Sequence, residues 1–391
     1  MKTATITWES YNNYGTLLQA YALQHAIEQL GHENLIISDR EILKEWNAKK
    51  AQEQPKFTNA GDGQGGITER LKRLLSNPGR LPRICMMRIN RKRYESPYYN
   101  SQAACEKFRQ NKLRVLYGQT KDKLPALNDQ FDMFICGSDQ IWSVQEGMFN
   151  PYYYLDFVTK KKISYAPSLG TDKISQKASN MIRKLLADYA AISVRESISA
   201  KQLSGLADKK VQWVVDPTLL HDRMFWEQLT FGIARRKKKY VLCYFLENRE
   251  WYFNYAKTIA KKLHLEIILL PNRWDFLSSE YIVNAGVGPK EFVSLIRHSD
   301  YVLTDSYHGS IFSMIFERDF QYLLRFSIDD PNSQNIRIQS LFDYLNLNDR
   351  IVFNEMENKP ALRIKDYSLI TSKIDIQRKK SQKYLRDCFN Q

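Results

Sequence analysis

The chain of 391 residues is long enough for two domains, and its 43% hydrophobic and 26% charged content is typical of a soluble globular protein. No apolar run reaches the roughly 18 to 20 residues of a membrane span, and the N-terminus lacks the apolar region of a signal peptide. The net charge of +15 favours an anionic partner: nucleic acid, lipid headgroups or a phosphorylated substrate. We therefore expect a cytoplasmic protein.

The cysteines predict neither disulfides nor a metal site. They are odd in number, and no CxxC pair or His/Cys cluster has the spacing of zinc ligands. Two of them stand in apolar strands, where a thiol is a small core residue. The five are Cys85, Cys105, Cys136, Cys243 and Cys388. We expect no metal and no cofactor.

The first elements form a β-α-β pattern. "TATITW" predicts a strand, "LLQAYALQHAIEQL" predicts a helix with an apolar side, and "NLIIS" predicts the next strand. Gly31 marks the end of the helix. An insertion over about 45–100 follows, and its first part is polar and glycine-rich.

Residues 67–93 of this insertion are strongly basic. They contain nine Lys or Arg and a single acid, Glu69, with four apolar residues at helical spacing. The pattern is typical of a helix that lies on an anionic membrane surface. A solvated basic helix packed on its own domain explains it equally well. Nucleic acid is not expected as a partner because no known binding motif is present.

A second series of strands and helices completes the first domain, which we place at residues 1–212. Its strands are predicted at "FDMFICG", "KKISYAPSLG" and "AAISVRE". Asp216-Pro217, in "WVVDPTLL", marks the boundary to a second series over 213–360, and a basic helix over 361–391 is expected to pack back on the first half. Helices alternating with short apolar strands predict an α/β protein with parallel sheets covered on both faces. We expect two Rossmann-like domains facing each other across a cleft.

Polar residues follow three of the predicted strands, where ligands bind in parallel sheets. The first group precedes a helix and contains Asn13, Tyr14 and Gly15; plain turn chemistry is the alternative. The second group is Gly137 to Trp142, in which polar side chains beside a tryptophan suit a sugar. The alternative is that Ser138 or Asp139 caps the next helix.

The third group joins a strand to a helix and runs from Asp305 to Ser310. A helix start favours an anion, and His308 could move a proton for its chemistry; the alternative is that His308 only caps the helix. Arg195 closes an apolar strand and suits a bidentate grip on carboxylate or phosphate, with pairing to Glu196 as the alternative. Arg325 and Arg337 are expected to add charge near the same cleft.

Other chemistries lack their motifs. The sequence has no GxGxxG, no Walker loop and no GxSxG. The remaining histidines are interpreted as ordinary surface or capping residues. They are His25, His32, His221, His264 and His298.

Six segments in this order resemble the polysaccharide pyruvyl transferase family. They are "NNYGTLLQAYALQ", "FICGSDQIW", "ISYAPSLG", "SVRE", "VVDPTLL" and "TDSYHGSIFSMIF". The resemblance runs from about Ile6 to Arg350 and does not cover the insertion. It implies a GT-B-like fold and the transfer of pyruvate from phosphoenolpyruvate to two hydroxyls of a sugar, as a cyclic ketal. In the family, the histidine of the "HG" motif and the arginine of the "R-E" strand end act in donor binding and catalysis, which implies His308 and Arg195 here.

The predicted site follows from these motifs. His308 is expected to act as general acid and base, Arg195 to hold the donor, and Asp139 to orient or deprotonate the acceptor. The other donor-binding residues are expected to be Ser306, Tyr307, Gly309, Ser310 and Arg337. The acceptor-binding residues are expected to be Asn13, Tyr14, Gly15, Gly137, Ser138, Asp139, Gln140 and Trp142.

The acceptor is expected to be a sugar on a lipid diphosphate in capsule or exopolysaccharide synthesis, with the basic segment holding the enzyme at the inner face of the membrane. Two alternatives remain open. One is a glycosyltransferase of the same architecture that uses a nucleotide sugar. The other is a non-catalytic scaffold that binds sugars or anions.

Overall fold

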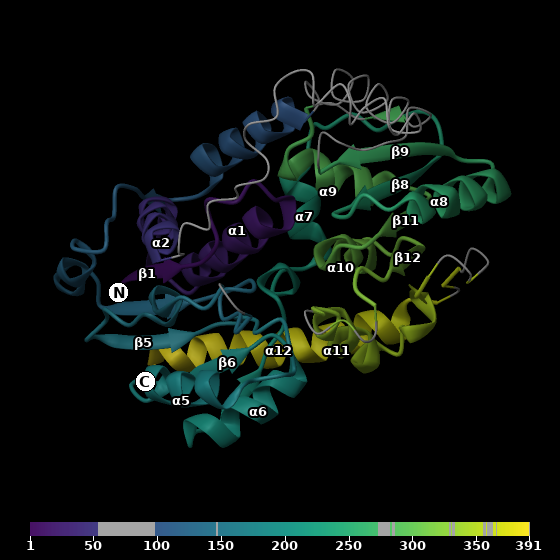
Figure 1. Cartoon of the computed structure of the whole chain (residues 1–391). Coiled ribbons are helices and arrows are strands. Elements are labelled where there is room, and N and C mark those ends of the chain that lie inside the picture. The colour runs from purple at the N-terminus through teal and green to yellow at the C-terminus, as the bar shows by residue number, and fades with distance from the viewer. Residues whose placement is uncertain are drawn as a thin grey trace, which may run out of the picture.

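The computed structural model describes residues 1–53, 98–145, 148–272, 282–283, 286–327, 333–354 and 366–390, together with residues 330, 357, 363 and 364. The basic segment 67–93 and Cys85 lie outside the described residues, as does most of the insertion predicted at 45–100. Figure 1 shows the two domains, with the residues outside the description drawn as a thin grey trace.

The first domain is built on a parallel sheet in the order β3-β2-β1-β4-β5. β1 lies at the centre, with Ile6 opposite Ile37 of β2 and Cys136 of β4. The strands are β1 (Lys2–Ile6), β2 (Glu33–Ile37), β3 (Val115–Leu116), β4 (Met133–Cys136) and β5 (Lys161–Ser164). β6 (Ile192–Val194) and β7 (Val211–Trp213) form a small sheet beside β5, joined to it by a bridge between Ile163 and Ala191.

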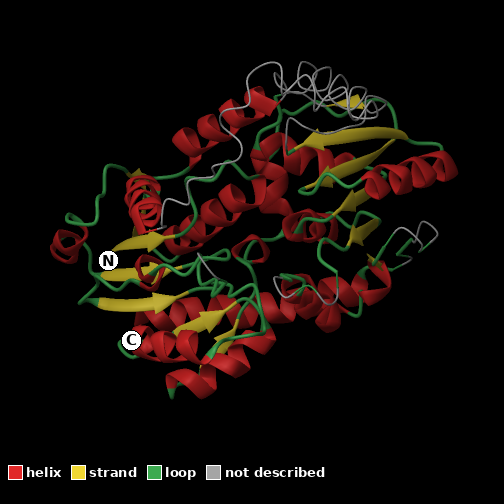
Figure 2. Ribbon diagram, viewed as in Figure 1, coloured by secondary structure: helices red, strands yellow, loops and turns green. Residues whose placement is uncertain are grey.

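The helices of the first domain are amphipathic or buried segments that cover its sheets. Ile6, Ile36, Ile37 and Ile135 are fully buried, as expected of a sheet covered on both faces. The helices are α1 (Tyr14–Gln29), α2 (Arg40–Glu53), α5 (Gln176–Leu186) and α6 (Ser197–Ala207), and residues 98–112 are also helical. Figure 2 shows them around the strands.

The second domain has a parallel sheet in the order β10-β9-β8-β11-β12-β13. Its strands are β8 (Tyr240–Phe245), β9 (Glu266–Pro271), β10 (Ile282–Val283), β11 (Tyr301–Thr304), β12 (Phe320–Leu323) and β13 (Ile351–Val352). Its helices are α7 (Arg223–Leu229), α8 (Glu250–Leu263), α9 (Pro289–His298), α10 (Tyr307–Ile315) and α11 (Ile336–Leu345). Among the helices that the structure describes, none combines the length and the apolar character needed to cross a bilayer.

Each sheet has a point at which the connections that follow two neighbouring central strands run toward opposite edges of the sheet. Ligands bind beyond the carboxyl ends of the strands at such points. In the first sheet this point lies between β1 and β4, and in the second between β8 and β11. The two points face each other, because Asn13 Nδ2 after β1 donates to the hydroxyl of Tyr244 in β8 at 3.4 Å. The fold therefore brings the loops after four central strands to one place.

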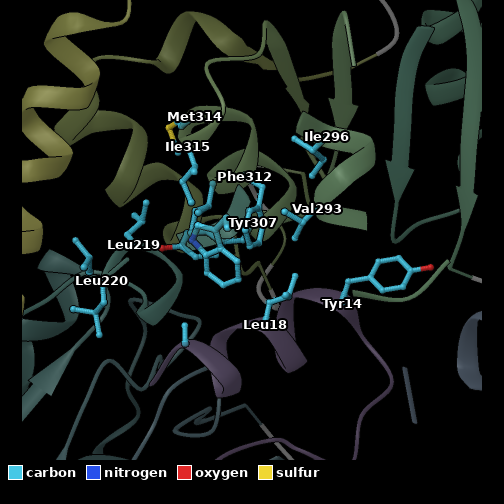
Figure 3. Packing of buried hydrophobic residues seen from close by; sticks show 14 of the residues in the cluster. Tyr14, Leu18, Leu219, Leu220, Val293, Ile296, Tyr307, Phe312, Met314 and Ile315 are labelled. Atoms are coloured by element: carbon cyan, nitrogen blue, oxygen red, sulfur yellow. The ribbon is translucent and has the colours of Figure 1, made fainter. Parts of the chain in front are cut away.

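A shared hydrophobic core joins the domains. Tyr14 at the start of α1 stacks on Phe292 of α9, with ring centroids 4.9 Å apart. Leu18 of α1 belongs to the same buried cluster as Val293 and Phe312, as Figure 3 shows. The prediction of an α/β protein with two facing Rossmann-like domains, a GT-B-like architecture, is confirmed.

The last helix, α12 (Ser368–Asn390), follows the second domain in sequence but packs on the first (Figure 1). The hydroxyl of Tyr384 donates to the carbonyl of Ser164 at 2.9 Å, and Lys161 Nζ donates to the carbonyl of Cys388 at 2.8 Å. Val215 N donates to Ser381 Oγ at 3.0 Å, so the helix also holds the segment between the domains.

Candidate functional site

Three charged residues from three parts of the chain meet between the domains. Arg195 follows β6, Asp216 lies in the segment between the domains, and His308 lies in the first turn of α10. Arg195 Nη1 donates to Asp216 Oδ2 at 2.8 Å, and His308 Nε2 lies 3.4 Å from the same oxygen. Asp216 therefore fixes the position of both side chains.

The charges of this group stabilise one another. Burial alone would raise the pKa of Asp216, but His308 and Arg195 hold it well below its usual range. Burial opposes the charge of Arg195, yet the neighbouring Tyr307, Glu196 and Asp216 raise its pKa above the usual value. Asp216 is thus an anion at any pH at which the protein works, and Arg195 is a permanent cation.

Asp139 and Tyr307 extend the group on either side of Arg195. Its guanidinium lies over the ring of Tyr307, 4.4 Å from the centroid, and Nη1 lies 4.0 Å from Asp139 Oδ1. Thr16 Oγ1 donates to Asp139 Oδ2 at 2.7 Å. Asp139 has a φ of 72° on the tight turn after β4, a conformation that asparagine and aspartate tolerate better than most residues. The turn thus aims this carboxylate at the group.

Gly15 is required for the position of His308. A Cβ at residue 15 would overlap Nδ1 and Cγ of the His308 imidazole. The absence of a side chain at Gly15 therefore leaves the space that the His308 ring occupies. The ring of His308 is consequently clamped between α1 and Asp216.

Substituting Gly15 by alanine is expected to lower kcat about 10²-fold, because the added methyl displaces the His308 ring by an ångström or more. The melting temperature is expected to change little, since alanine favours the helix. The matched control is Gly205→Ala, which adds a methyl to α6 with nothing within 4 Å. Equal rates for the two variants would contradict the clamp.

Two further arginines lie at the carboxyl edge of the second sheet. Arg325 follows β12, and Arg337 lies in the first turn of α11. Both donate to Gln334 Oε1, at 2.9 Å and 3.0 Å. Burial, together with the nearby charges of Arg325 and Arg195, lowers the pKa of Arg337 to about 10. Positive charge therefore accumulates here, as at a site that binds an anion.

Two buried donors of this group have no hydrogen-bond partner among the described residues. They are Arg195 Nη2 and Arg325 Nε. Buried polar atoms are normally paired, so unpaired donors beside clustered arginines favour an anionic ligand. Arg195 also pairs with Glu196 at 3.3 Å, the alternative weighed above, and most of its guanidinium is therefore engaged within the protein.

The start of α10 differs from the prediction. Ser306 caps the helix through its own oxygens, which accept from the N–H groups of Gly309 and Ser310 at 3.4 Å and 3.1 Å. Gly309 packs against Thr304, and Ser310 is fully buried. The prediction that Gly309 and Ser310 hold an anion is therefore wrong, because their N–H groups are already bonded. Ser306 and Tyr307 remain beside the group.

Asp305, singled out in the same motif, has a structural role. It accepts from the N–H groups of Leu246 and Glu247 at 2.6 Å and 3.0 Å, and so ties the loop after β8 to the loop after β11. Burial raises the pKa of Asp305 to about 7. The carboxyl group is thus spent on positioning the backbone and does not face His308.

The structure gives the predicted acceptor residues different roles. Asn13 Oδ1 accepts from Gly15 N and Thr16 N and caps α1. Tyr14 is buried against Tyr244 and Phe292 in the core between the domains, so it presents no surface to a sugar. Asn13 and Tyr14 thus support the site through helix capping and core packing.

The structure also corrects the predicted role of Trp142. Its side chain is fully buried and stacks on Tyr154 at 4.9 Å, while Nε1 donates to the carbonyl of Tyr153 at 3.0 Å. The prediction that its face receives a sugar is wrong, because the aromatic core of the first domain covers it. Gly137 and Ser138 are buried too, since a Cβ at Gly137 would meet the carbonyl of Tyr165 and Ser138 Oγ donates to Ala166 O. Gln140 is buried with Nε2 unpaired among the described residues.

One of the histidines interpreted as surface residues is a core residue. His221 is 6% exposed, stacks on Phe225 at 4.0 Å, and hydrogen-bonds to the carbonyl of Ala22 at 2.9 Å. Burial lowers its pKa to about 4. It therefore stays neutral and belongs to the packing between α1 and α7.

Sequence reasoning missed Asp216, the centre of the site. "VVDPTLL" was interpreted as a domain boundary, and Asp216 does cap the short 3-10 helix Pro217–Leu219 by accepting from Thr218 N at 3.0 Å. Its other oxygen, however, holds Arg195 and His308. A carboxylate directly after an apolar run was the available signal.

Two facing Rossmann-like domains thus hold clustered arginines and a histidine–aspartate pair between them, an arrangement that suits an anionic ligand. The family model described as polysaccharide pyruvyl transferase matches residues 13–320, and the chain belongs to this family. No curated protein matches the chain. Among the described residues, no group of three or more His, Cys, Asp or Glu could hold a metal ion.

Solved structures resemble the whole chain at low identity. UDP-GlcNAc 2-epimerase from Neisseria meningitidis, bound to UDP-GlcNAc, is 13% identical over 98% of this chain and 100% of its own, with a TM-score of 0.45. A glycosyltransferase from Rickettsia africae is 10% identical over 99% and 92%, with a TM-score of 0.41. An E. coli heptosyltransferase with ADP is 10% identical over 85% and 89%, with a TM-score of 0.37.

Proposed function

We propose that the protein transfers pyruvate from phosphoenolpyruvate to two hydroxyls of a sugar, forming a cyclic ketal in the synthesis of a cell-surface glycan. The observation that carries the proposal is the convergence of Arg195, Arg325 and Arg337 on the edge of the cleft that holds His308. Phosphoenolpyruvate carries a carboxylate and a phosphate on three carbons. Two anionic groups so close together suit a cluster of arginines.

The roles divide according to burial. The side chain of Arg195 is 1% exposed and engaged by Asp216 and Glu196, so it positions Asp216 and offers the donor its one unpaired nitrogen, Nη2. Arg325 and Arg337 are half-buried and carry the charge that grips the carboxylate and phosphate. The donor then lies at the ends of β11 and β12, next to His308.

His308 supplies the proton transfers. Asp216 against Nε2 and Gly15 against Nδ1 hold the ring in the orientation from which it exchanges a proton with the substrate. A proton goes to the methylene carbon of the enol, and a sugar hydroxyl attacks the adjacent carbon and loses its own proton. Phosphate leaves, and a neighbouring hydroxyl closes the ring. Asp139, which lies next to Arg195 on the side of the first domain, orients the acceptor.

The acceptor that we propose is a sugar linked to a lipid diphosphate, used at the cytoplasmic face of the membrane. The two domains enclose a hollow of ≈ 270 Å³ beside the arginine cluster, lined by Thr171 and Ile198 on one side and Asn335 and Phe353 on the other. Association of the basic segment 67–93 with anionic lipid stays a prediction. So does the expectation that no cofactor or metal takes part.

Calorimetric titration of phosphoenolpyruvate is the direct test. Arg337→Gln and Arg325→Gln are each expected to weaken binding about 10- to 10²-fold, because each removes a charged hydrogen bond to the donor. The control is Arg318→Gln. Arg318 precedes β12 and so lies at the opposite edge of the same sheet.

The outcomes separate the alternatives. Binding that is lost in both cluster variants and kept in the control supports the proposed donor. Binding of a nucleotide sugar without binding of phosphoenolpyruvate would instead make the protein a glycosyltransferase. A protein that binds both substrates of the proposed reaction without forming product would be a scaffold.

A further inference from the structure

A pair of aromatic side chains, one exposed and one half-buried, follows β1. Trp8 and Tyr11 lie with ring centroids 5.3 Å apart and ring planes inclined at 52°. Tyr11 is 49% exposed, although it is a large aromatic residue, and Trp8 is half-buried against the core of the first domain. Exposed aromatics at a strand end are costly to leave in water and often mark a binding surface.

The loop that carries the pair is unusually firmly held. The fully buried Arg109 donates through Nε to the carbonyl of Glu9 at 2.8 Å and through Nη2 to Asn12 Oδ1 at 2.7 Å. The carboxylate of Glu9, itself buried, lies 3.0 Å from Arg109 Nε. Ser10 N donates to the buried carboxylate of Asp39 at 3.2 Å. The backbone on both sides of Tyr11 is thus anchored, while its ring is half exposed beside Trp8.

The anchoring points to display of a surface rather than to a mobile loop. A surface that is fixed before binding loses less conformational entropy when a ligand arrives. A buried charged network is an expensive way to hold a loop that has no other task. The network therefore holds the loop in a conformation that presents Trp8 and Tyr11 in one geometry.

The pair is also close to the chemistry. The loop follows β1, and Asp139 follows the neighbouring strand β4. Tyr11 lies in the loop that leads directly into α1, and Thr16 in the first turn of α1 donates through Oγ1 to Asp139 Oδ2 at 2.7 Å. Asp139 in turn lies 4.0 Å from Arg195. A ring lying on the aromatic pair would therefore extend toward the donor site.

We propose that Trp8 and Tyr11 form the stacking platform for the pyranose ring of the acceptor, and so take the place that sequence reasoning gave to Trp142. The inference rests on the proposed function, because a sugar must be the second substrate. The C–H face of a pyranose packs on aromatic faces, and its hydroxyls remain free to meet Asp139. The platform thereby decides which sugar hydroxyls reach the donor.

Saturation-transfer NMR tests the platform without using turnover. The probes are p-nitrophenyl β-galactoside, β-glucoside and β-N-acetylmannosaminide, each at millimolar concentration. At least one is expected to receive saturation on its ring C–H protons from the wild-type protein. Tyr11→Ala and Trp8→Ala are each expected to weaken that binding about 2- to 12-fold, the range for losing one aromatic contact.

The controls separate stacking from folding and from donor binding. Tyr11→Phe should keep the binding, since the ring remains. Phe231→Ala should also keep it, because Phe231 is 89% exposed but precedes β8 at the far edge of the second sheet. Phosphoenolpyruvate should bind the Tyr11 and Trp8 variants as it binds the wild type, measured by calorimetry on the same samples.

Two results would overturn the platform: no saturation on any of the three glycosides, or unchanged sugar binding after both alanine substitutions. Failure of the proposed donor is a different observation, because it shows as absent phosphoenolpyruvate binding to the wild-type protein.

Discussion

His308→Ala is expected to lower kcat by about 10²- to 10⁴-fold, the usual contribution of a positioned general acid and base. His308 lies in the first turn of α10, is 7% exposed, and is held by Asp216 on one side and α1 on the other. A ring so constrained delivers its proton to one point. The measurement is phosphate release from phosphoenolpyruvate in the presence of an acceptor glycoside.

Binding should separate from catalysis in this variant. The arginine cluster remains, so the Kd for phosphoenolpyruvate is expected to change far less than the rate. His298→Ala is a matched control, since His298 ends α9 in the same domain and hydrogen-bonds only locally, to Ser294. A kcat within a few-fold of wild type for His308→Ala would remove the histidine from the mechanism.

Asp216→Asn is expected to have the second large effect, on both rate and stability. An amide cannot hold Arg195 and His308 as the carboxylate does, so the rate is expected to fall by about 10²- to 10⁴-fold, as for other histidine–aspartate pairs. Removing one member of a buried ion pair costs about 3–5 kcal/mol. The loss should lie at the low end, because Glu196 still faces Arg195.

The pH dependence of stability should change in the same variant. The folded protein holds the pKa of Asp216 below its unfolded value, so its contribution is complete above about pH 4 and is lost as pH falls through the folded pKa. Asp216→Asn lacks this contribution at every pH. Urea unfolding from neutral to acid pH should therefore show a shallower decline for the variant than for the wild type.

Glu196→Gln distinguishes the two roles of Asp216. Glu196 pairs with Arg195 as Asp216 does, but no contact is recorded between Glu196 and His308 in the described residues. Its substitution should lower stability while the rate falls much less than in Asp216→Asn. Equal rate losses in the two variants would show that Arg195, rather than the histidine, carries the effect of Asp216.

The fold could be predicted because each local pattern agreed with the tertiary structure. Buried strands of a parallel sheet are short continuous apolar runs, and "FDMFICG" and "KYVLCYFL" contain β4 and β8 for that reason. The structure shows that Asn13 and Ser306 cap α1 and α10, roles that the sequence analysis did not assign to them. The family followed from the order of six segments, each of which lies at the carboxyl end of a strand or just after it.

The site was only partly predictable, because a sequence motif does not show whether its side chains are exposed to solvent. Trp142 and Tyr11 are both aromatic residues near strand ends, yet one is fully buried and the other is half exposed. The difference arises from packing: Tyr154 and Tyr153 return from a later loop to cover Trp142. Arg325 and Arg337 were expected near the cleft, but only the fold shows that both donate to Gln334.

By itself, the sequence determined the fold class, the family and the identity of His308 and Arg195 as residues to examine, since these follow from short-range patterns. Only the tertiary structure decided that Asp216 joins the two, that Gly15 makes room for the histidine, and that Trp8 and Tyr11 rather than Trp142 face the solvent. The physical reason is that an arginine–aspartate–histidine cluster and an exposed surface depend on contacts between residues far apart in the chain. Those distances are set by the packing of α1 against α9 and α10, which no local pattern encodes.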